Sequence, residues 1–208
     1  MSRDGSPSPD KSTAPQISSG HPASAATCDA GIFIDDCLGK SAIGIVWSGR
    51  MIPEDGDDDD FTIPIAVKMA VPRENADPEA DEDERDTIRE EGLIYDYFAK
   101  SGTHGITPRY FGVFEDAVGT VAVILENGGT ALKTFQNLAN DQAQKLFAKA
   151  VEMHSAGVRH HDLVPRNVVR DSDGDLKIID FHVAKTGHRC RGSLKCKELL
   201  QLSAALGL

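Results

Sequence analysis

The segment from His160 to Asn167 constrains the fold of this 208-residue chain more than any other feature of its sequence. It directly follows residues 141–155, where apolar side chains recur at the spacing of one helix face. Two short strands are expected after it, over 167–170 and 176–179, around an Asp- and Gly-rich turn. A surface turn would explain any single aspartate. It does not explain Asp and Asn five residues apart in this segment, with a further Asp after an apolar strand.

Those three polar residues are Asp162, Asn167 and Asp180, and together they suggest a chemistry. Asp162 can orient an attacking hydroxyl group and accept its proton. Asn167 and Asp180 supply hard oxygen ligands of the kind that hold Mg²⁺ against nucleotide phosphates. The pattern therefore predicts a phosphoryl-transfer site.

The remaining elements predict an α+β fold in two lobes. A small antiparallel sheet with one helix is expected first, and a mainly helical part follows. The expected strands are 32–37, 43–47, 63–69, 110–114 and 120–125, and the expected helices are 81–100, 141–155 and 193–206.

Lys68 ends the apolar strand Ile65-Ala66-Val67-Lys68, so its ammonium group needs an anionic partner if it is buried. Glu91 on the following helix is a suitable carboxylate. Glu90 projects about 100° away around that helix, so only one of the two glutamates can face Lys68. When Lys68 is considered alone, a solvent-exposed lysine at the end of a strand is an equally good interpretation.

A glycine-containing loop precedes this strand. Gly39 and Gly44 stand at the two ends of the loop between two expected strands, where the lack of a side chain lets the backbone approach a phosphate closely. A plain hairpin turn explains the loop better when it is considered alone.

Composition excludes several classes of protein. The net charge of −11 argues against a general nucleic-acid binder, and no run approaches transmembrane length. Residues 54–60 carry six acidic residues and residues 73–91 carry ten, so the rest of the chain is close to neutral; both segments are expected to be solvated. Residues 1–30, with seven Ser and four Pro, are expected to be a disordered tail. Four cysteines suggest no disulfide framework, which favours an intracellular, cytoplasmic or nuclear location.

In this order the motifs resemble the protein-kinase fold, from the glycine-rich loop through the lysine strand, the helix-C glutamate and the catalytic loop to the Asp-Phe-Gly position. Their local forms resemble short fungal protein-kinase-like proteins across roughly residues 31–208. The residues that carry this resemblance are Glu91 and Tyr95, Thr107–Gly112, Ile124–Gly129, Asp162 with Pro165-Arg166-Asn167, and the closing His188, Cys190, Cys196 and Glu198-Leu199.

The resemblance implies an N-lobe over about 31–126, a C-lobe over about 127–208, and ATP and Mg²⁺ as ligands. Lys68 would hold the α- and β-phosphates and be positioned by Glu91. Asp162 would be the catalytic base, with Asn167 and Asp180 as metal ligands. The residues that would surround the nucleotide are Leu38, Gly39, Ser41, Gly44 and Val46 over the phosphates, Ala66 and Leu125 around adenine, and the backbone of Glu126 and Gly128 at its edge.

The chain also departs from the kinase pattern. His161 replaces an Arg that in many kinases pairs with a phosphorylated activation loop, so phosphorylation is not the expected switch. His182 replaces the Gly of Asp-Phe-Gly, and Val164 replaces a Lys for which Arg166 could substitute. Only 26 residues follow His182, without an Ala-Pro-Glu motif, which predicts a truncated C-lobe.

Three functions therefore stay open. The first is an ATP-dependent transfer to Ser/Thr hydroxyls of an unknown protein substrate. The second is a pseudokinase or nucleotide-binding interaction module. The third is a small-molecule kinase, because His-x-Asp-x4-Asn also occurs in aminoglycoside- and choline-type phosphotransferases. The oligomeric state cannot be deduced.

The last motif is a group of His188, Cys190 and Cys196, which could be three zinc ligands. No fourth ligand is obvious and the spacing matches no common zinc finger, so packing of the last helix is the favoured interpretation.

Overall fold

The computed structural model describes residues 31–41, 43–52, 62–74, 77–103 and 105–208. The predicted tail over 1–30 and the acidic run over 54–60 lie outside the described residues. The elements are β1 (Gly31–Lys40), β2 (Ile45–Ile52), β3 (Ile63–Ala70), α1 (Pro78–Ser101), β4 (Tyr110–Glu115), β5 (Val121–Glu126), β6 (Thr130–Ala131), α2 (Asn140–Ser155), η1 (Pro165–Asn167), β7 (Val168–Arg170), β8 (Leu176–Ile178) and α3 (Lys197–Leu206).

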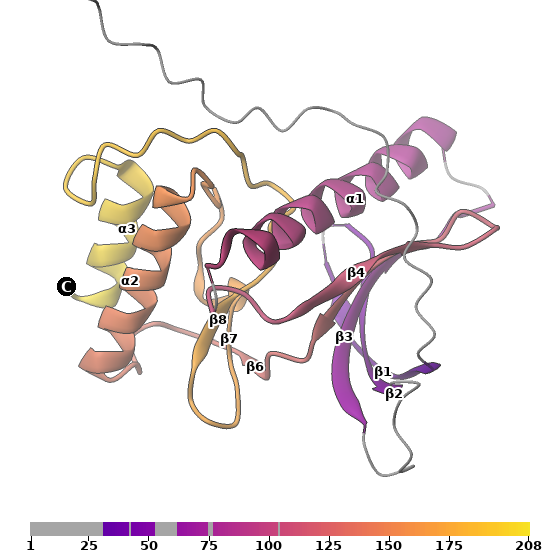
Figure 1. Cartoon of the computed structure of the whole chain (residues 1–208), viewed down its shortest axis with the longest axis horizontal. Coiled ribbons are helices and arrows are strands. Elements are labelled where there is room, and N and C mark those ends of the chain that lie inside the picture. The colour runs from indigo at the N-terminus through magenta and orange to yellow at the C-terminus, as the bar shows by residue number, and fades with distance from the viewer. Residues whose placement is uncertain (1–30, 42, 53–61, 75–76, 104) are drawn as a thin grey trace, which may run out of the picture.

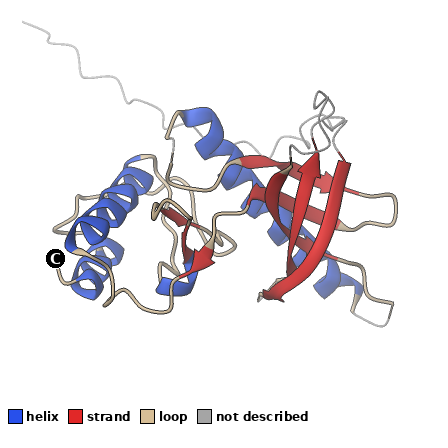
Figure 2. Cartoon of the chain, turned by 90° about the horizontal axis from the view of Figure 1, so that it is seen from below, coloured by secondary structure: helices blue, strands red, loops and turns tan. Residues whose placement is uncertain are grey.

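The first lobe is an antiparallel five-stranded sheet with the strand order β1-β2-β3-β5-β4. α1 packs against β3, β4 and β5, and it crosses the sheet in both views (Figures 1 and 2). In the pairing of β2 with β3, Val46 lies opposite Lys68, and in the pairing of β3 with β5, Ala66 lies opposite Leu125. Residues that the sequence separates by up to 59 positions thus meet on neighbouring strands.

α1 has clear signals at both ends. The Asp77 carboxylate accepts a hydrogen bond from the Glu79 amide at 3.0 Å, Pro78 occupies the first turn, and Gly102 ends the helix in a left-handed conformation with φ 73°. Its buried face includes the apolar residues Ile88, Ile94, Tyr95 and Phe98, whereas Leu93 is 55% exposed. Leu93 precedes the buried Ile94 by one position and therefore points about 100° away from it.

The second lobe contains the three-stranded sheet β6-β7-β8 and the two helices α2 and α3, which lie side by side (Figure 1). Asn140 and Asp141 are residue types that commonly cap a helix, but neither is the N-cap of α2. The cap is Ala139, whose amide donates to Gln142 Oε1 at 3.4 Å. Gly157 follows the C-cap Ala156 with φ 82°.

Several element boundaries differ from the expected ones; β2, for example, spans Ile45–Ile52 and not 43–47. α3 begins at Lys197 and not near 193, because a turn at Gly192, whose carbonyl accepts from the amides of Lys195 and Cys196, occupies the preceding residues. Asn167 lies in the 3₁₀ turn η1 and not in the following strand, and the two-residue strand β6 was not predicted. η1 and β6 are short segments of three and two residues, in which no periodicity can develop.

One hydrophobic core extends through both lobes. Phe181 from the second lobe is 1% exposed and packs edge-on against Tyr95 of α1, with the ring centroids 5.2 Å apart. The α+β, two-lobed fold class predicted from the sequence is therefore confirmed, and Figure 2 shows the sheet and the α2–α3 pair at opposite ends. Among the described residues, no helix has the length and apolar character needed to cross a membrane.

Candidate active site

A cavity of about 780 Å³ is lined by residues of both lobes. Its walls come from the β1–β2 hairpin, the inner strands of the sheet, the Glu126–Gly129 connection, η1 and the segment after β8. Every residue predicted to contact nucleotide lines it except Gly44, and so do all residues predicted to be catalytic or to bind metal. The predicted residues in its wall are Leu38, Gly39, Ser41, Val46, Ala66, Lys68, Glu91, Leu125, Glu126, Gly128, Asp162, Asn167 and Asp180.

Lys68 is the buried cation of this cavity, with only 8% of the residue exposed. Its Nζ atom lies 2.7 Å from Glu91 Oε2 and 2.6 Å from Asp180 Oδ1. Burial opposes the charge most strongly, but the two carboxylates outweigh it and raise the pKa of Lys68. The ion pair with Glu91 is the one expected from the sequence. Glu90 is exposed, as the helix geometry required.

Asp180 is held in place from several sides. It has φ 67°, which is uncommon for a residue with a side chain, and its amide donates to the Tyr95 hydroxyl at 3.0 Å. Its Oδ1 atom also lies 2.8 Å from Nδ1 of His182. Burial alone would raise the pKa of Asp180, but the charges of Lys68 and His182 outweigh burial and lower it. The carboxyl group is therefore an anion at neutral pH.

Glu91 also ties α1 to the second lobe. Its Oε2 atom accepts from Lys68, while Oε1 accepts a hydrogen bond from the Phe181 amide at 3.1 Å. The side chain is 2% exposed. The position of this glutamate thus depends on both lobes at once.

Asp162 and Asn167 form the opposite side of the site. The Asn167 amide nitrogen donates to the Asp162 carbonyl at 2.8 Å and to Asp162 Oδ2 at 2.9 Å. Because the NH₂ group is used in this way, the Oδ1 atom of Asn167 is the one left to accept or to ligate. Arg166 reaches the same Asp162 Oδ2 atom with Nη2 at 2.7 Å. The sequence therefore brings a carboxylate, an amide and a guanidinium into one cluster.

The glycine-containing loop closes another side of the cavity. Gly44 has φ 77°, and a Cβ atom there would lie 2.3 Å from the Met69 carbonyl oxygen, so only glycine fits. Its amide donates to Glu84 Oε1 of α1 at 2.7 Å. Gly44 therefore contacts the helix, while Gly39 and Ser41 line the cavity.

The sheet side of the cavity is apolar. Val46, Ala66 and Leu125 line it together with Val123. At Gly128 a Cβ atom would come within 2.6 Å of a Val169 methyl group and 3.1 Å of Pro108, so a side chain would not fit there without displacing them. Apolar side chains of this kind suit contact with the face of a planar heterocycle.

Sequence reasoning missed two residues that contact Asp180. Tyr95 was named only among the residues that carry the family resemblance, although its hydroxyl accepts from the Asp180 amide. His182 counted only as the replacement of a glycine, although it contacts the carboxylate. A hydroxyl on a buried helix face was the available signal for Tyr95.

Comparison with known proteins gives local similarity to serine/threonine protein kinases. The probable serine/threonine-protein kinase ifkC of Dictyostelium discoideum is 45% identical over 56 residues, which are 25% of this chain and 3% of that protein. Mitogen-activated protein kinase 4 of Oryza sativa subsp. japonica is 38% identical over 61 residues, 27% of this chain and 16% of the other. Serine/threonine-protein kinase chk1 of Schizosaccharomyces pombe is 50% identical over 48 residues, 21% of this chain and 10% of the other.

The fold is protein-kinase-like. No family model matches the chain, and the similarity spans only a small part of each curated relative. The matches support a kinase-like function in general. In the cavity described above, polar residues of both lobes line one space.

Proposed function

We propose that this protein is an ATP-dependent phosphotransferase that transfers the γ-phosphoryl group of ATP to a Ser or Thr hydroxyl of a protein. One observation carries the proposal: two groups of polar residues line the same cavity. The first is Lys68 with its two partners Glu91 and Asp180, and the second is Asp162 with Asn167. The first cluster supplies a fixed cation, and the second supplies a carboxylate. The resemblance to short fungal protein-kinase-like proteins, stated from the sequence, is part of the same proposal.

The side chains available also fit a magnesium ion. Mg²⁺ prefers oxygen ligands, and both Asn167 Oδ1 and the carboxylate of Asp180 are oxygens on residues that line the cavity. Asn167 is 3% exposed, and its NH₂ group donates hydrogen bonds to Asp162. These bonds hold the side-chain amide in one orientation and leave Oδ1 as the atom that can bind the metal ion. When bound, the metal ion would neutralise charge on the phosphates.

The protein's own residues would do the following. Lys68 would bind the α- and β-phosphates, and these contacts would partly replace its contact with Asp180. Asp162 would accept the proton of the attacking hydroxyl, since Asn167 fixes its orientation. Arg166, already in contact with Asp162, would balance negative charge on the transferring group. Catalysis would consist mainly of positioning and of charge stabilisation.

The test is turnover of radiolabelled ATP by the full chain with Mg²⁺, using casein and myelin basic protein as acceptors. Asp162→Asn removes the base and is expected to lower transfer by about 10²- to 10⁴-fold while Mg-ATP still raises the melting temperature. Glu91→Gln is expected to lower transfer at least about tenfold. The matched control is Glu90→Gln, one residue away on the exposed face, which should leave transfer unchanged.

The outcomes separate the three open functions. Wild-type protein that binds Mg-ATP without transfer, with Asp162→Asn behaving identically, indicates a nucleotide-binding interaction module. Phosphate transfer to choline or an aminoglycoside but not to protein indicates a small-molecule kinase. Loss of nucleotide binding in Lys68→Met together with an inert wild type contradicts the enzyme proposal.

A further inference from the structure

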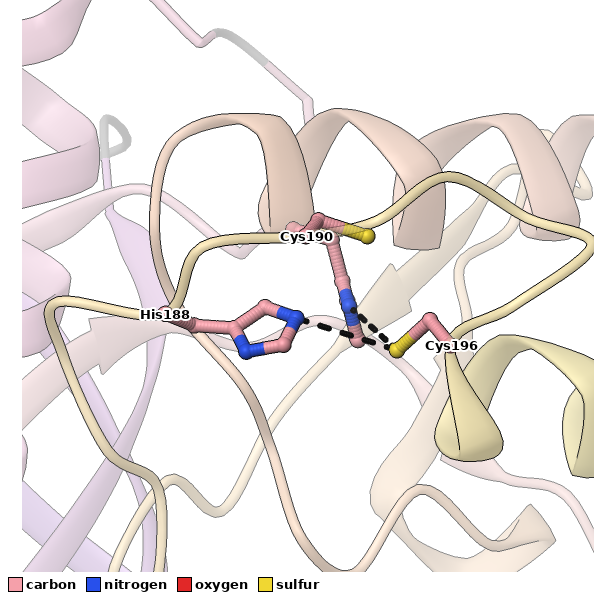
Figure 3. Close-up of side chains that lie close together, drawn as sticks. His188, Cys190 and Cys196 are labelled. Atoms are coloured by element: carbon pink, nitrogen blue, oxygen red, sulfur yellow. Dashed lines mark hydrogen bonds between the residues drawn. The ribbon is translucent and has the colours of Figure 1, made fainter.

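Four side chains with nitrogen or sulfur ligand atoms meet in the second lobe, and none of them lines the kinase-like cavity. They are His154, in the last turn of α2, His188 and Cys190, on the loop before α3, and Cys196, at the N-cap of α3. One ligand atom from each lies within 4.8 Å of the others. Figure 3 shows His188 pointing toward Cys196, with Cys190 on the same loop. The fourth ligand that the sequence did not reveal is therefore His154, which lies 34 positions before His188.

Two of the separations between these atoms match those of a tetrahedral centre. Cys196 Sγ lies 3.4 Å from His154 Nδ1 and 3.7 Å from His188 Nε2. A tetrahedral zinc ion with ordinary Zn–N and Zn–S bond lengths holds such N and S atoms about 3.6 Å apart.

The orientation of His154 is also that of a metal ligand. Its Nδ1 atom faces Cys196, and its Nε2 atom lies 2.6 Å from Glu198 Oε2. A carboxylate on the far nitrogen is the usual partner of a zinc-bound histidine, because it fixes the tautomer and the ring. His154 is 1% exposed, and Cys196 is 7% exposed. The group is thus built into the second lobe and not gathered by chance on a surface.

The charges of such a centre balance. Two cysteine thiolates neutralise the two charges of Zn²⁺, and the two histidines bind as neutral imidazoles, so a half-buried site gains no net charge. Nitrogen and sulfur ligands favour zinc over the oxygen-preferring Mg²⁺. Four protein ligands leave no position for a substrate, which is the arrangement of a structural site.

We propose that His154, His188, Cys190 and Cys196 bind one zinc ion, which fastens the loop before α3 to the C-terminal end of α2. Glu198 extends the effect of the site, since its Oε1 and Oε2 atoms also accept from the amides of His161 and His160 at 2.6 and 3.1 Å. The zinc site is thereby connected to the segment that carries Asp162. It goes beyond the proposed phosphotransferase function and does not depend on it.

The test measures zinc in the full chain, purified without a metal-affinity tag from zinc-supplied cells and passed over chelating resin. Elemental analysis is expected to find close to one zinc per chain. Cys190→Ser is the first variant to make, because this residue is only partly buried and the chain should still fold; it should lower zinc affinity by at least about 100-fold. Cys37→Ser, at the exposed cysteine of β1, is the matched control and should retain the metal.

Cobalt gives a second readout, independent of enzyme activity. Chelator-treated protein titrated with Co²⁺ should show the intense visible absorption of tetrahedral cobalt and a thiolate charge-transfer band that is weakened in Cys190→Ser. Circular dichroism verifies that the variant is folded. The proposal is overturned if folded wild-type protein, titrated with Zn²⁺, binds no stoichiometric zinc. It is overturned equally if Cys37→Ser loses as much metal as Cys190→Ser, or if mass spectrometry of fresh protein finds Cys190 and Cys196 joined as a disulfide.

Discussion

Lys68 keeps its charge inside the protein because two carboxylates contact one nitrogen atom. The contact with Glu91 could be predicted from the sequence, since a strand-end lysine needs a partner and helix geometry selects one of two adjacent glutamates. The contact with Asp180 could not, because that residue lies 112 positions away. Sequence thus indicates that a buried charge needs partners, and tertiary structure decides how many it has.

His160 is a second buried residue whose protonation state affects the site. It is completely buried, its Nε2 lies 2.9 Å from the Ile179 carbonyl oxygen, and its Nδ1 accepts from the Asp162 amide at 3.3 Å. Burial lowers the pKa of His160 because the charged form loses its hydration. Protonation would also place an N–H against the Asp162 amide. The neutral ring therefore supports the loop that carries Asp162.

This predicts a pH dependence of stability. As the pH falls below the usual histidine pKa of about 6.5, the unfolded chain takes up this proton before the folded chain does, so the free energy of unfolding decreases, by at most about 1.4 kcal/mol per pH unit for this group. The measurement is urea unfolding between about pH 7.5 and pH 5. His160→Gln should flatten the slope, while His161→Asn, at an exposed position where Asn tolerates the positive φ of 68°, should not. Equal slopes in His160→Gln and wild type would contradict the assignment.

At the scale of elements, the long periodic segments were predictable and the short ones were not. α1 and α2 were found because their buried faces recur over several turns, whereas η1 and β6 contain two or three residues each. The start of α2 shows the same limit, because Asn140 and Asp141 are common capping residues, yet the N-cap is Ala139. The capping propensities of neighbouring residues allow several N-caps, and the folded structure determines which residue becomes the cap.

Gly92 shows how closely one element can approach another. It lies on the buried face of α1, and a Cβ atom there would come within 2.1 Å of a Val113 methyl group on β4 and 3.3 Å of one on Val123. The absence of a side chain is therefore what lets the helix lie against the sheet. Nothing in the local sequence announces this, because glycine within a helix is ordinarily unfavourable by about 1 kcal/mol relative to alanine.

We expect Gly92→Ala to lower the free energy of unfolding by about 1–3 kcal/mol, although alanine is the better helix former. The cause is steric, since the β-branched Val113 side chain cannot turn away easily. The matched test is a double-mutant cycle with Val113→Ala, measured by urea unfolding. Part of the loss should be recovered in the double variant. Additive losses would mean that this contact is not the cause.

At the scale of the whole molecule, Phe181 joins the lobes into one cooperative unit. Its ring centroid lies 5.2 Å from that of Tyr95, 5.5 Å from that of Phe98 and 4.8 Å from that of His160, so residues of both lobes surround it. The same core cluster includes residues of the sheet and of α2 and α3. The lobes therefore share buried surface and are not merely joined by a linker.

We predict that Phe181→Ala costs about 3–5 kcal/mol and uncouples the lobes. Trp47, the single tryptophan, lies in β2 and reports on the first lobe, while far-ultraviolet circular dichroism is weighted toward the helices. In wild type the two signals should follow one denaturation curve, and in Phe181→Ala they should separate. Val183→Ala, at a position 39% exposed two residues away, is the control and should leave the curves coincident. Coincident curves in a strongly destabilised Phe181→Ala would contradict the coupling.

The sequence by itself determined the two-lobed α+β class and the identities of the polar residues at the proposed active site. It could do so because helix periodicity and the short spacing between Asp162 and Asn167 are local properties of the chain. Only the tertiary structure decided that Asp180 contacts Lys68, that Tyr95 and His182 contact Asp180, and that His154 joins His188, Cys190 and Cys196. These groups are brought together by burial of one shared core, and residue spacing along the chain does not encode which distant side chains that burial places in contact.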